Sequence, residues 1–379
     1  MTSAVPLQTR DPAVSNNETA VAARWQIHAA QPPVDWWPQW DALNARYFAG
    51  HPLLSSSMAR GLVAHCAGEA MCYAALRSEG SPQAMAVLSK LPGGRWTIFT
   101  PSQAPLSLLL IDPSLSEPYA VLKTLLSSLP AFGLSLDVPA LDPSLLPAAT
   151  PGAARVETVS LGTTIQVAQT DGFEAYWNTR SRDLKQNIRR YFKRTAEAGM
   201  PCRLERVTEP QKIGAAVDRY GLLESEGWKG RDGTALHPQN VQGRLYRELL
   251  ESFAQQGNAV AYELYAGDQF AASRLMISGP SMQVMLKTTY RESLRQQAVG
   301  RLLLYLTLED LLKVPQPRPV EFFTRANQDM LTWATGTREL FSSTIYRNAA
   351  VQLAVGLRRK LRARRAPPPE QQEPAAAGN

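Results

Sequence analysis

The run of residues 290–304, Tyr-Arg-Glu-Ser-Leu-Arg-Gln-Gln-Ala-Val-Gly-Arg-Leu-Leu-Leu, has a composition suited to binding an anion. A strand-like segment ends there in a short polar loop, and small residues precede a leucine-rich helix. The first N–H groups of a helix lack intrahelical acceptors, and its N-terminus carries partial positive charge. Small residues let the backbone approach a phosphate closely. The pattern predicts a diphosphate site formed by Arg295, Gln296, Ala298, Val299, Gly300 and Arg301.

The segments around this loop predict the elements that position it. Upstream, three apolar and partly alternating runs at 259–265, 270–277 and 282–288 are separated by turns rich in Gly, Asp and Pro, which indicates an antiparallel meander. Downstream, the leucines of 301–313 predict a helix buried on much of its surface, ended by three prolines. Residues 320–323 then read as another strand. The predicted order is meander, anion loop, helix and strand.

Two more segments hold side chains suited to binding and catalysis. Residues 173–194 contain Arg189, and residues 222–230 read Leu-Leu-Glu-Ser-Glu-Gly-Trp-Lys-Gly, which includes Glu224, Trp228 and Lys229. Together with the loop, they resemble the GNAT acetyltransferases associated with bacterial cellulose and exopolysaccharide synthesis. That group is similar to the Fem-type aminoacyl transferases. The resemblance covers residues 166–340.

The resemblance implies a fold and a co-substrate. GNAT enzymes have a mixed, twisted α/β sheet flanked by helices, and Fem-type transferases contain two such lobes. The family's R/Q-x-x-G-x-G/A loop cradles the pyrophosphate of coenzyme A, so acetyl-CoA is the expected co-substrate. Ala298 stands where the family has its first glycine. Residues 326–333 lack the Tyr-Lys pair that commonly follows the family's closing strand, so no role of that pair transfers.

Length and composition agree with a two-domain globular protein. The chain has 379 residues, of which 44% are hydrophobic. We expect a disordered N-terminus at 1–22, a degenerate GNAT-like lobe at 23–155 and a GNAT transferase domain at 156–350. A basic helix end and disordered tail follow at 351–379. The Pro- and Ala-rich stretch 139–154 is the predicted linker.

Cysteine and histidine usage argues against a metal site. Three cysteines and four scattered histidines show no metal-ligand spacing, so no metal is expected. The N-terminal residues do not resemble a signal peptide, and no apolar stretch is long enough to span a membrane. These features predict a cytoplasmic protein.

Positive charge is concentrated in two places. The net charge is +7, of which residues 180–194 carry +6 and residues 358–379 carry +4, so the remainder carries −3. This is not the broad basic footprint of a DNA-binding domain. The first cluster lies on an amphipathic helix, where Arg189 either binds a phosphate-bearing acceptor or belongs to a solvated face. The second predicts either a frayed, solvated helix or peripheral contact with an anionic membrane.

The expected chemistry needs a base for the nucleophile, an oxyanion partner and an acid for the thiolate. Glu224 is the candidate base, with an exposed helix carboxylate as the alternative. Tyr305 is the candidate acid, with a core tyrosine as the alternative. In GNAT enzymes a backbone N–H, here within residues 284–288, serves the oxyanion. Trp228 and Lys229 are expected to shape the acceptor cleft, or Trp228 is purely structural.

Three functions follow from these features. The first is transfer of an acetyl group from acetyl-CoA to an amine or hydroxyl of a sugar or glycan-precursor acceptor, in polysaccharide or cell-envelope biosynthesis. The second is a Fem-type transfer from aminoacyl-tRNA, with the basic helix gripping RNA. The third is a non-catalytic scaffold that assists polysaccharide synthase machinery.

Overall fold

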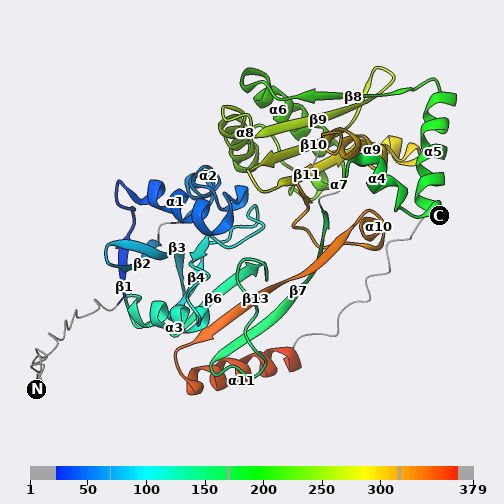
Figure 1. Cartoon of the computed structure of the whole chain (residues 1–379). Helices are drawn as coiled ribbons and strands as arrows, with labels where there is room; N and C mark the ends of the chain where they lie inside the picture. Colours follow the sequence, from blue (N-terminus) through cyan, green and yellow to red (C-terminus); the bar gives the residue numbers. More distant parts are fainter. Residues whose placement is uncertain (1–22, 69, 169–170, 315–316, 366–379) are drawn as a thin grey trace, which may run out of the picture.

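The computed structural model describes residues 23–68, 70–168, 171–314 and 317–365, with side chains described to residue 358 in the last helix. The disorder predicted for 1–22 and 366–379 lies outside the described residues. Thirteen described strands form one continuous mixed sheet with helices on both sides (Figure 1). The predicted α/β class and GNAT-like sheet are confirmed.

The sheet has two similar halves joined at its centre. The order is β1-β2-β3-β4-β6-β13-β7-β12-β11-β10-β9-β8, with β5 paired to β3. The N-terminal half contains β1 (Arg24–Ala29), β2 (Met71–Ser78), β3 (Ser81–Leu91), β4 (Arg95–Ile98), β5 (Leu109–Ile111) and β6 (Ser135–Leu141). The C-terminal half contains β8 (Cys202–Val207), β9 (Ala259–Ala266), β10 (Gln269–Ser278), β11 (Gln283–Tyr290) and β12 (Val320–Glu321). The central pair is β7 (Val156–Val167) and β13 (Gly336–Tyr346).

Each half follows the same plan, which confirms two GNAT-like lobes. A four-strand antiparallel meander is followed by a parallel fifth strand: β4 pairs with β6, and β11 pairs with β12. The central strands are exchanged between the lobes. β7 follows β6 in the chain but pairs with β12, whereas β13 follows β12 but pairs with β6. β7 and β13 also pair with each other along most of their length (Figure 1).

The helices complete both lobes. The N-terminal lobe has α1 (Trp36–Phe48), η1 (Pro52–Leu54), α2 (Ser56–Cys66) and α3 (Pro118–Ser128). The C-terminal lobe has α4 (Phe173–Asn178), α5 (Arg182–Glu197), α6 (Pro210–Glu226), α7 (Trp228–Arg231), α8 (Val241–Ala254), η2 (Glu292–Gln297), α9 (Val299–Leu311) and α10 (Gln328–Leu331). The chain continues into α11 (Ala349–Arg365). α2 packs on α8, so a single apolar core includes Leu62 of one lobe and Leu245 of the other.

The local sequence correctly predicts the basic helix α5, whereas two predicted boundaries differ from those in the structure. The Ser181 hydroxyl caps α5 by accepting from the Leu184 N–H, and the apolar stripe of this helix is buried as predicted. The linker prediction is wrong at its start, because Pro139 belongs to β6, where its missing N–H is tolerated near the strand end. The other boundary is the start of the basic C-terminal helix, which lies at Ala349, three residues after β13 ends at Tyr346.

A buried ion cluster joins the two lobes next to the central strands. The guanidinium of Arg338 on β13 contacts Asp142 (Nε–Oδ2, 2.6 Å) and Glu321 (Nη1–Oε2, 2.8 Å). Both carboxylates are almost fully buried. The same guanidinium lies 4.9 Å from the centroid of the Phe323 ring, whose other neighbour is the His51 imidazole at 5.6 Å. One cation therefore ties a residue that follows β6 to a residue of β12.

His51 gives this junction a defined pH dependence. Burial lowers the pKa of its imidazole to about 4, with a smaller lowering from Arg338 and an opposing effect of Asp142. The unfolded chain binds this proton near pH 6.5, so the stability contributed by neutral His51 is complete above pH 6.5 and is lost as pH falls toward 4. The loss amounts to about 3 kcal/mol. We expect His51→Leu to lack this part of the acid destabilisation when unfolding free energies are compared between pH 7 and pH 4. Equal pH slopes for both proteins would contradict the assignment.

Candidate functional site

A β-bulge lies between the last two strands of the C-terminal meander, β10 and β11. In the β10–β11 ladder, Leu275 pairs with Lys287 and Met276 with Met285, so Leu286 has no partner in β10. Such a bulge bends its strand and increases the local twist. β11 pairs with β12 only through Gln283 and Val284, near its start. Beyond Val284 and Glu321, no further ladder pairing joins the two strands among the described residues.

The equivalent strands of the N-terminal lobe are bridged by its own chain. Past the β4–β6 pairing, Ser107 N–H donates to Ala140 O (3.1 Å) and Leu108 N–H donates to Phe99 O (3.3 Å). Residues 107 and 108 thus bridge the ends of both strands, and both are buried. In the described part of the C-terminal lobe, no hydrogen bond bridges residues 285–288 to residues 322–325 in this way. Among the described residues, this backbone bridge is present in the N-terminal lobe alone.

The predicted anion loop has the geometry of a helix start. Residues 292–297 form a short 3₁₀ turn, Ala298 adopts a left-handed conformation (φ 54°, ψ 36°), and α9 begins at Val299. Ala298 O accepts from the N–H groups of Arg301 (2.9 Å) and Leu302 (3.1 Å). The N–H groups of Val299 and Gly300 come before the first intrahelical hydrogen bonds of α9. A side chain at Gly300 would lie 3.3 Å from the Tyr290 ring. The backbone at 298–300 is therefore compact, with Val299 buried and Ala298 and Gly300 partly exposed.

The charged side chains of the loop differ in availability. Arg295 and Gln296 are exposed at its start. Arg301, in contrast, is held by Asp329 (2.9 Å) and by the Tyr191 hydroxyl (2.7 Å) on the side of α10 and α5. The guanidinium of Arg194 on α5 donates to Gln296 O, which brings the basic helix against the loop.

The N-terminal lobe has an unsuitable sequence at the corresponding helix start. There α3 is preceded by Asp112 and Glu117, and its first residue is Pro118, which has no N–H. Acidic side chains repel a phosphate and the proline removes a donor. The features that suit anion binding are thus confined to the C-terminal lobe of the described chain.

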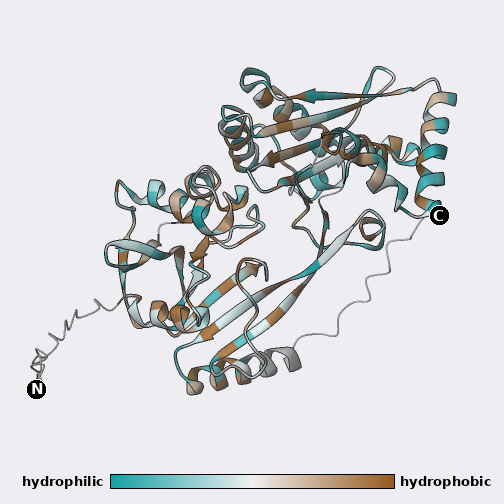
Figure 2. Ribbon diagram, viewed as in Figure 1, coloured by the Kyte–Doolittle hydropathy of each residue, from teal (hydrophilic) through white to brown (hydrophobic). Residues whose placement is uncertain are grey.

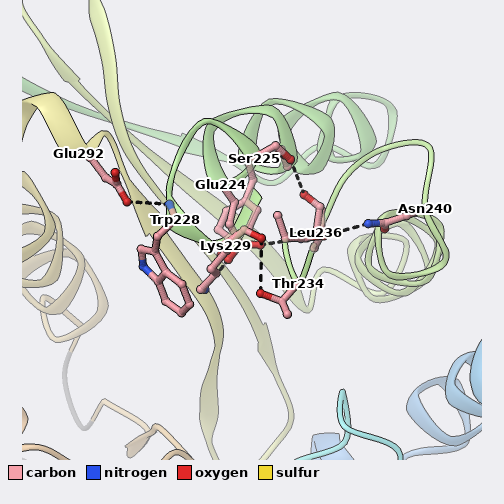
Figure 3. A network of polar contacts seen from close by, with 11 residues as sticks. Glu224, Ser225, Trp228, Lys229, Thr234, Leu236, Asn240 and Glu292 are labelled. Carbon is pink, nitrogen blue, oxygen red and sulfur yellow. Dashed lines mark hydrogen bonds and ion pairs between the residues drawn. The ribbon is translucent and has the colours of Figure 1, made fainter. Parts of the chain in front are cut away.

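Glu224 is the centre of a buried polar network at the end of α6 (Figure 3). Its Oε1 accepts from the Tyr220 hydroxyl (3.0 Å) and from Lys229 Nζ (2.5 Å), and its Oε2 accepts from the Leu236 N–H (2.7 Å). The residue is 2% exposed, so the alternative of a solvated helix carboxylate is wrong. The buried carboxylate raises the pKa of the Tyr220 hydroxyl further, after the larger effect of burial.

A second contact connects this network to the anion loop. The Glu292 carboxylate on η2 accepts from the Trp228 N–H (2.7 Å) and lies 3.4 Å from Arg231 (Figure 3). The Trp228 N–H bond is the first cause that holds the pKa of Glu292 below its usual range. Trp228 is 54% exposed, and Lys229 Nζ lies 5.8 Å from the centroid of its ring. The predicted acceptor residues Trp228 and Lys229 therefore lie beside the predicted cofactor loop.

Lys287 is a residue of this region that sequence reasoning missed. It follows the bulge on β11, and its Nζ lies 5.3 Å from the centroid of the Tyr246 ring of α8. Burial lowers the pKa of its ammonium group, while Glu224 raises it by a smaller amount and Lys229 opposes that effect. The available signal was one lysine within the otherwise apolar run 282–288.

Tyr305 and Arg189 lie away from this network. The Tyr305 ring packs among Phe173, Trp177 and Phe192, with centroid distances of 5.2, 4.9 and 5.6 Å. Burial is the main cause that raises the pKa of its hydroxyl. Arg189 is exposed on α5, a helix that Figure 2 shows as predominantly hydrophilic. The structure thus brings Glu224, Trp228 and Lys229 together. Tyr305 on α9 and Arg189 on α5 lie outside this group.

The fold is a GNAT-type α/β sheet with two lobes. Residues 182–328 match the model of an acetyltransferase (GNAT) domain, so this part of the chain is a GNAT-type domain. No curated protein matches the sequence significantly.

Solved structures agree on the fold across both lobes. FemX is 11% identical with a TM-score of 0.52, covering 86% of this chain and 99% of FemX. A conserved protein of unknown function from Bacteroides thetaiotaomicron is 10% identical with a TM-score of 0.54, covering 84% of this chain and all of that protein. At this level of sequence identity, the similarity shows a shared fold and no more than that. The cellulose and exopolysaccharide type is a narrower hypothesis than the GNAT-type domain.

The left-handed Ala298 predicts a stabilising substitution. A residue with a Cβ costs about 1–2 kcal/mol in this conformation, whereas glycine adopts it freely. After the added flexibility of the unfolded chain, we expect Ala298→Gly to raise the unfolding free energy by about 0.5–1 kcal/mol. Ala196→Gly, at an exposed position inside α5, is the matched control and should lower it by about 1 kcal/mol. Chemical denaturation measures both, and destabilisation by Ala298→Gly would refute the strained loop.

Proposed function

We propose that the protein transfers an acetyl group from acetyl-CoA to an amine or hydroxyl of a sugar or glycan-type acceptor. The observation that carries the proposal is the difference between the two lobes. Residues 107 and 108 bridge the ends of β4 and β6 in one lobe, whereas in the other no described backbone hydrogen bond bridges β11 and β12 beyond Val284 and Glu321, next to the start of α9. A lobe whose own chain does not bridge these strands is suited to holding an extended ligand there.

The bridge formed by residues 107 and 108 also indicates what kind of ligand the C-terminal lobe accepts. In the N-terminal lobe, two successive amide N–H groups satisfy carbonyls at the ends of β4 and β6. The pantetheine arm of coenzyme A carries two amides and is similarly narrow, so it can form the same type of contacts with β11 and β12. Its pyrophosphate is then expected at the start of α9, next to the partly exposed Gly300 and the exposed Arg295.

Acyl transfer in this site requires stabilisation of negative charge on the thioester oxygen. The acceptor attacks the carbonyl carbon and releases its proton to a water molecule, and the oxygen becomes an oxyanion. As the carbonyl reforms, the C–S bond breaks and the coenzyme A thiolate leaves and takes up a proton from solvent. Backbone N–H groups of residues 285–288 at the bulge are the proposed oxyanion donors. Lys287 adds a partly buried cation near them, where electrostatic effects are strong.

Glu224 fits a positioning role in this proposal. Its carboxylate accepts three hydrogen bonds, so taking a proton from an acceptor would displace one of them. Glu224 instead binds Lys229 and the Leu236 N–H, and these contacts fix the segment that contains Trp228. An exposed indole stacks on the apolar face of a sugar ring, which favours a glycan-type acceptor.

A Fem-type transfer from aminoacyl-tRNA is the second candidate, and one contact favours it. The basic helix α5 touches the anion loop through Arg194 and Gln296, so a phosphate chain extending from the loop would meet Arg189 and its neighbours. The affinity for such a ligand would fall steeply as the salt concentration rises. Under either proposal, the polysaccharide synthase machinery is a proposed binding partner of the protein.

Lys287 is the residue that we expect to separate activity from stability. Lys287→Met retains the length of the side chain and removes the charge near the bulge. We expect turnover to fall by about 10²-fold, the size of effect seen when one oxyanion partner is lost. Lys287→Arg should retain more activity than Lys287→Met. Steady-state kinetics and thermal unfolding measure both effects, and unchanged turnover in a folded Lys287→Met protein would remove Lys287 from the mechanism.

Thermal unfolding with and without acetyl-CoA tests the proposed function directly. Ligand at about a hundred times its dissociation constant should stabilise the native chain by roughly 2.7 kcal/mol. Gly300→Trp fills the proposed pyrophosphate position and should abolish the shift. Gly356→Trp is the matched control, because this helical glycine has open space around it, and it should respond like the native chain.

The other outcomes distinguish the candidates. No stabilisation of the native chain by acetyl-CoA, with salt-sensitive binding of tRNA, would replace the first candidate by the second. Stabilisation retained in Gly300→Trp would place the cofactor away from the loop.

A further inference from the structure

The last described helix presents an apolar face that no other described element covers. Leu353 and Leu357, one helical turn apart on α11, are 75% and 61% exposed. Ala350 and Ala354 are exposed on the same side, which makes a continuous stripe at i, i+3, i+4 and i+7. β13 is the main neighbour of α11, which lies at the outer end of the central strand pair (Figure 1). A water-exposed helix normally turns its leucines inward.

The orientation of this face is fixed by the start of the helix. The guanidinium of Arg347 donates to Gly133 O (3.0 Å) and lies 3.9 Å from the centroid of the Phe132 ring. Asn348 caps the first turn, its Oδ1 accepting from the Val351 N–H (2.9 Å). The first turn is thus anchored to the N-terminal lobe. The leucines point outward because the helix is held in place.

Charge along this segment has one sign. Residues 340–369 contain seven basic residues and no Asp or Glu. Six of the seven lie between 358 and 365, directly after the leucine stripe. Leucines on one face followed by lysine and arginine are typical of helices that lie in a membrane interface. None of the described helices is long and apolar enough to cross a bilayer.

We propose that α11 docks the protein on the surface of an anionic lipid bilayer, with its leucine stripe in the interface and its basic residues against the headgroups. Charge complementarity selects this occupant. A second copy of the chain would have to bring acidic residues to a face whose own sequence has none. The proposal concerns where the protein acts and is independent of which acyl donor it uses.

Cosedimentation of the full chain with vesicles tests the proposal. We expect binding to vesicles of phosphatidylglycerol and phosphatidylcholine, weakening at least tenfold on neutral phosphatidylcholine vesicles. Binding should also weaken when salt rises from 50 to 500 mM, because headgroup attraction is screened. Equal binding to both vesicle types, or none to either, would overturn the proposal.

Two variants localise the contact. The double variant Leu353→Gln/Leu357→Gln removes the apolar stripe without changing charge, and we expect at least tenfold weaker vesicle binding. Leu222→Gln, an exposed leucine on α6, is the matched control and should bind like the native chain. Vesicle binding unchanged in the double variant would refute the proposal. A native dimer in light scattering that the double variant converts to a monomer, without vesicle binding, would assign the face to a second copy instead.

Discussion

The exchange of β7 and β13 is the constraint on which the rest of the structure depends. Each lobe's fifth strand is covered by a strand that belongs to the other lobe's part of the chain, so neither half-sheet is complete alone. Arg338 reinforces this arrangement by binding Asp142 and Glu321 in a buried position. Removing one member of such a cluster leaves an uncompensated buried charge, which is strongly destabilising. The lobes are therefore one folding unit, with α2 and α8 sharing a core.

This mutual dependence makes the N-terminal lobe necessary to the fold whether or not it binds a ligand. In that lobe residues 107 and 108 bridge the ends of β4 and β6, and acidic residues precede α3. The C-terminal lobe has instead a bulge between β10 and β11 and the left-handed Ala298 before α9. Because β12 pairs with β7 on its far side, the position of β12 beside β11 is supported by a strand that follows the N-terminal lobe in the chain.

The sequence predicts the local features and not the long-range ones. Punctuated apolar runs locate the meander 259–290, and the leucines of 301–313 locate α9, because these signals arise from neighbouring residues. The strand exchange cannot be predicted from local patterns, since it pairs residues as far apart in the chain as Leu141 and Phe341. Burial of Glu224 was equally hidden, because its partners Lys229 and Leu236 come from a loop whose path no periodicity fixes.

The contact between Glu292 and Trp228 links the predicted anion loop to the predicted acceptor segment. One carboxylate on the anion loop holds the backbone of the segment that carries Trp228 and Lys229, and Lys229 in turn binds Glu224. Rearrangement of the loop around a phosphate would therefore alter the position of the acceptor segment through a single hydrogen bond. Glu292 is partly solvated, so this bond can break and reform without leaving a buried charge. Such a weak link is suited to coupling cofactor binding with acceptor binding, whereas the buried Arg338 cluster is suited to staying fixed.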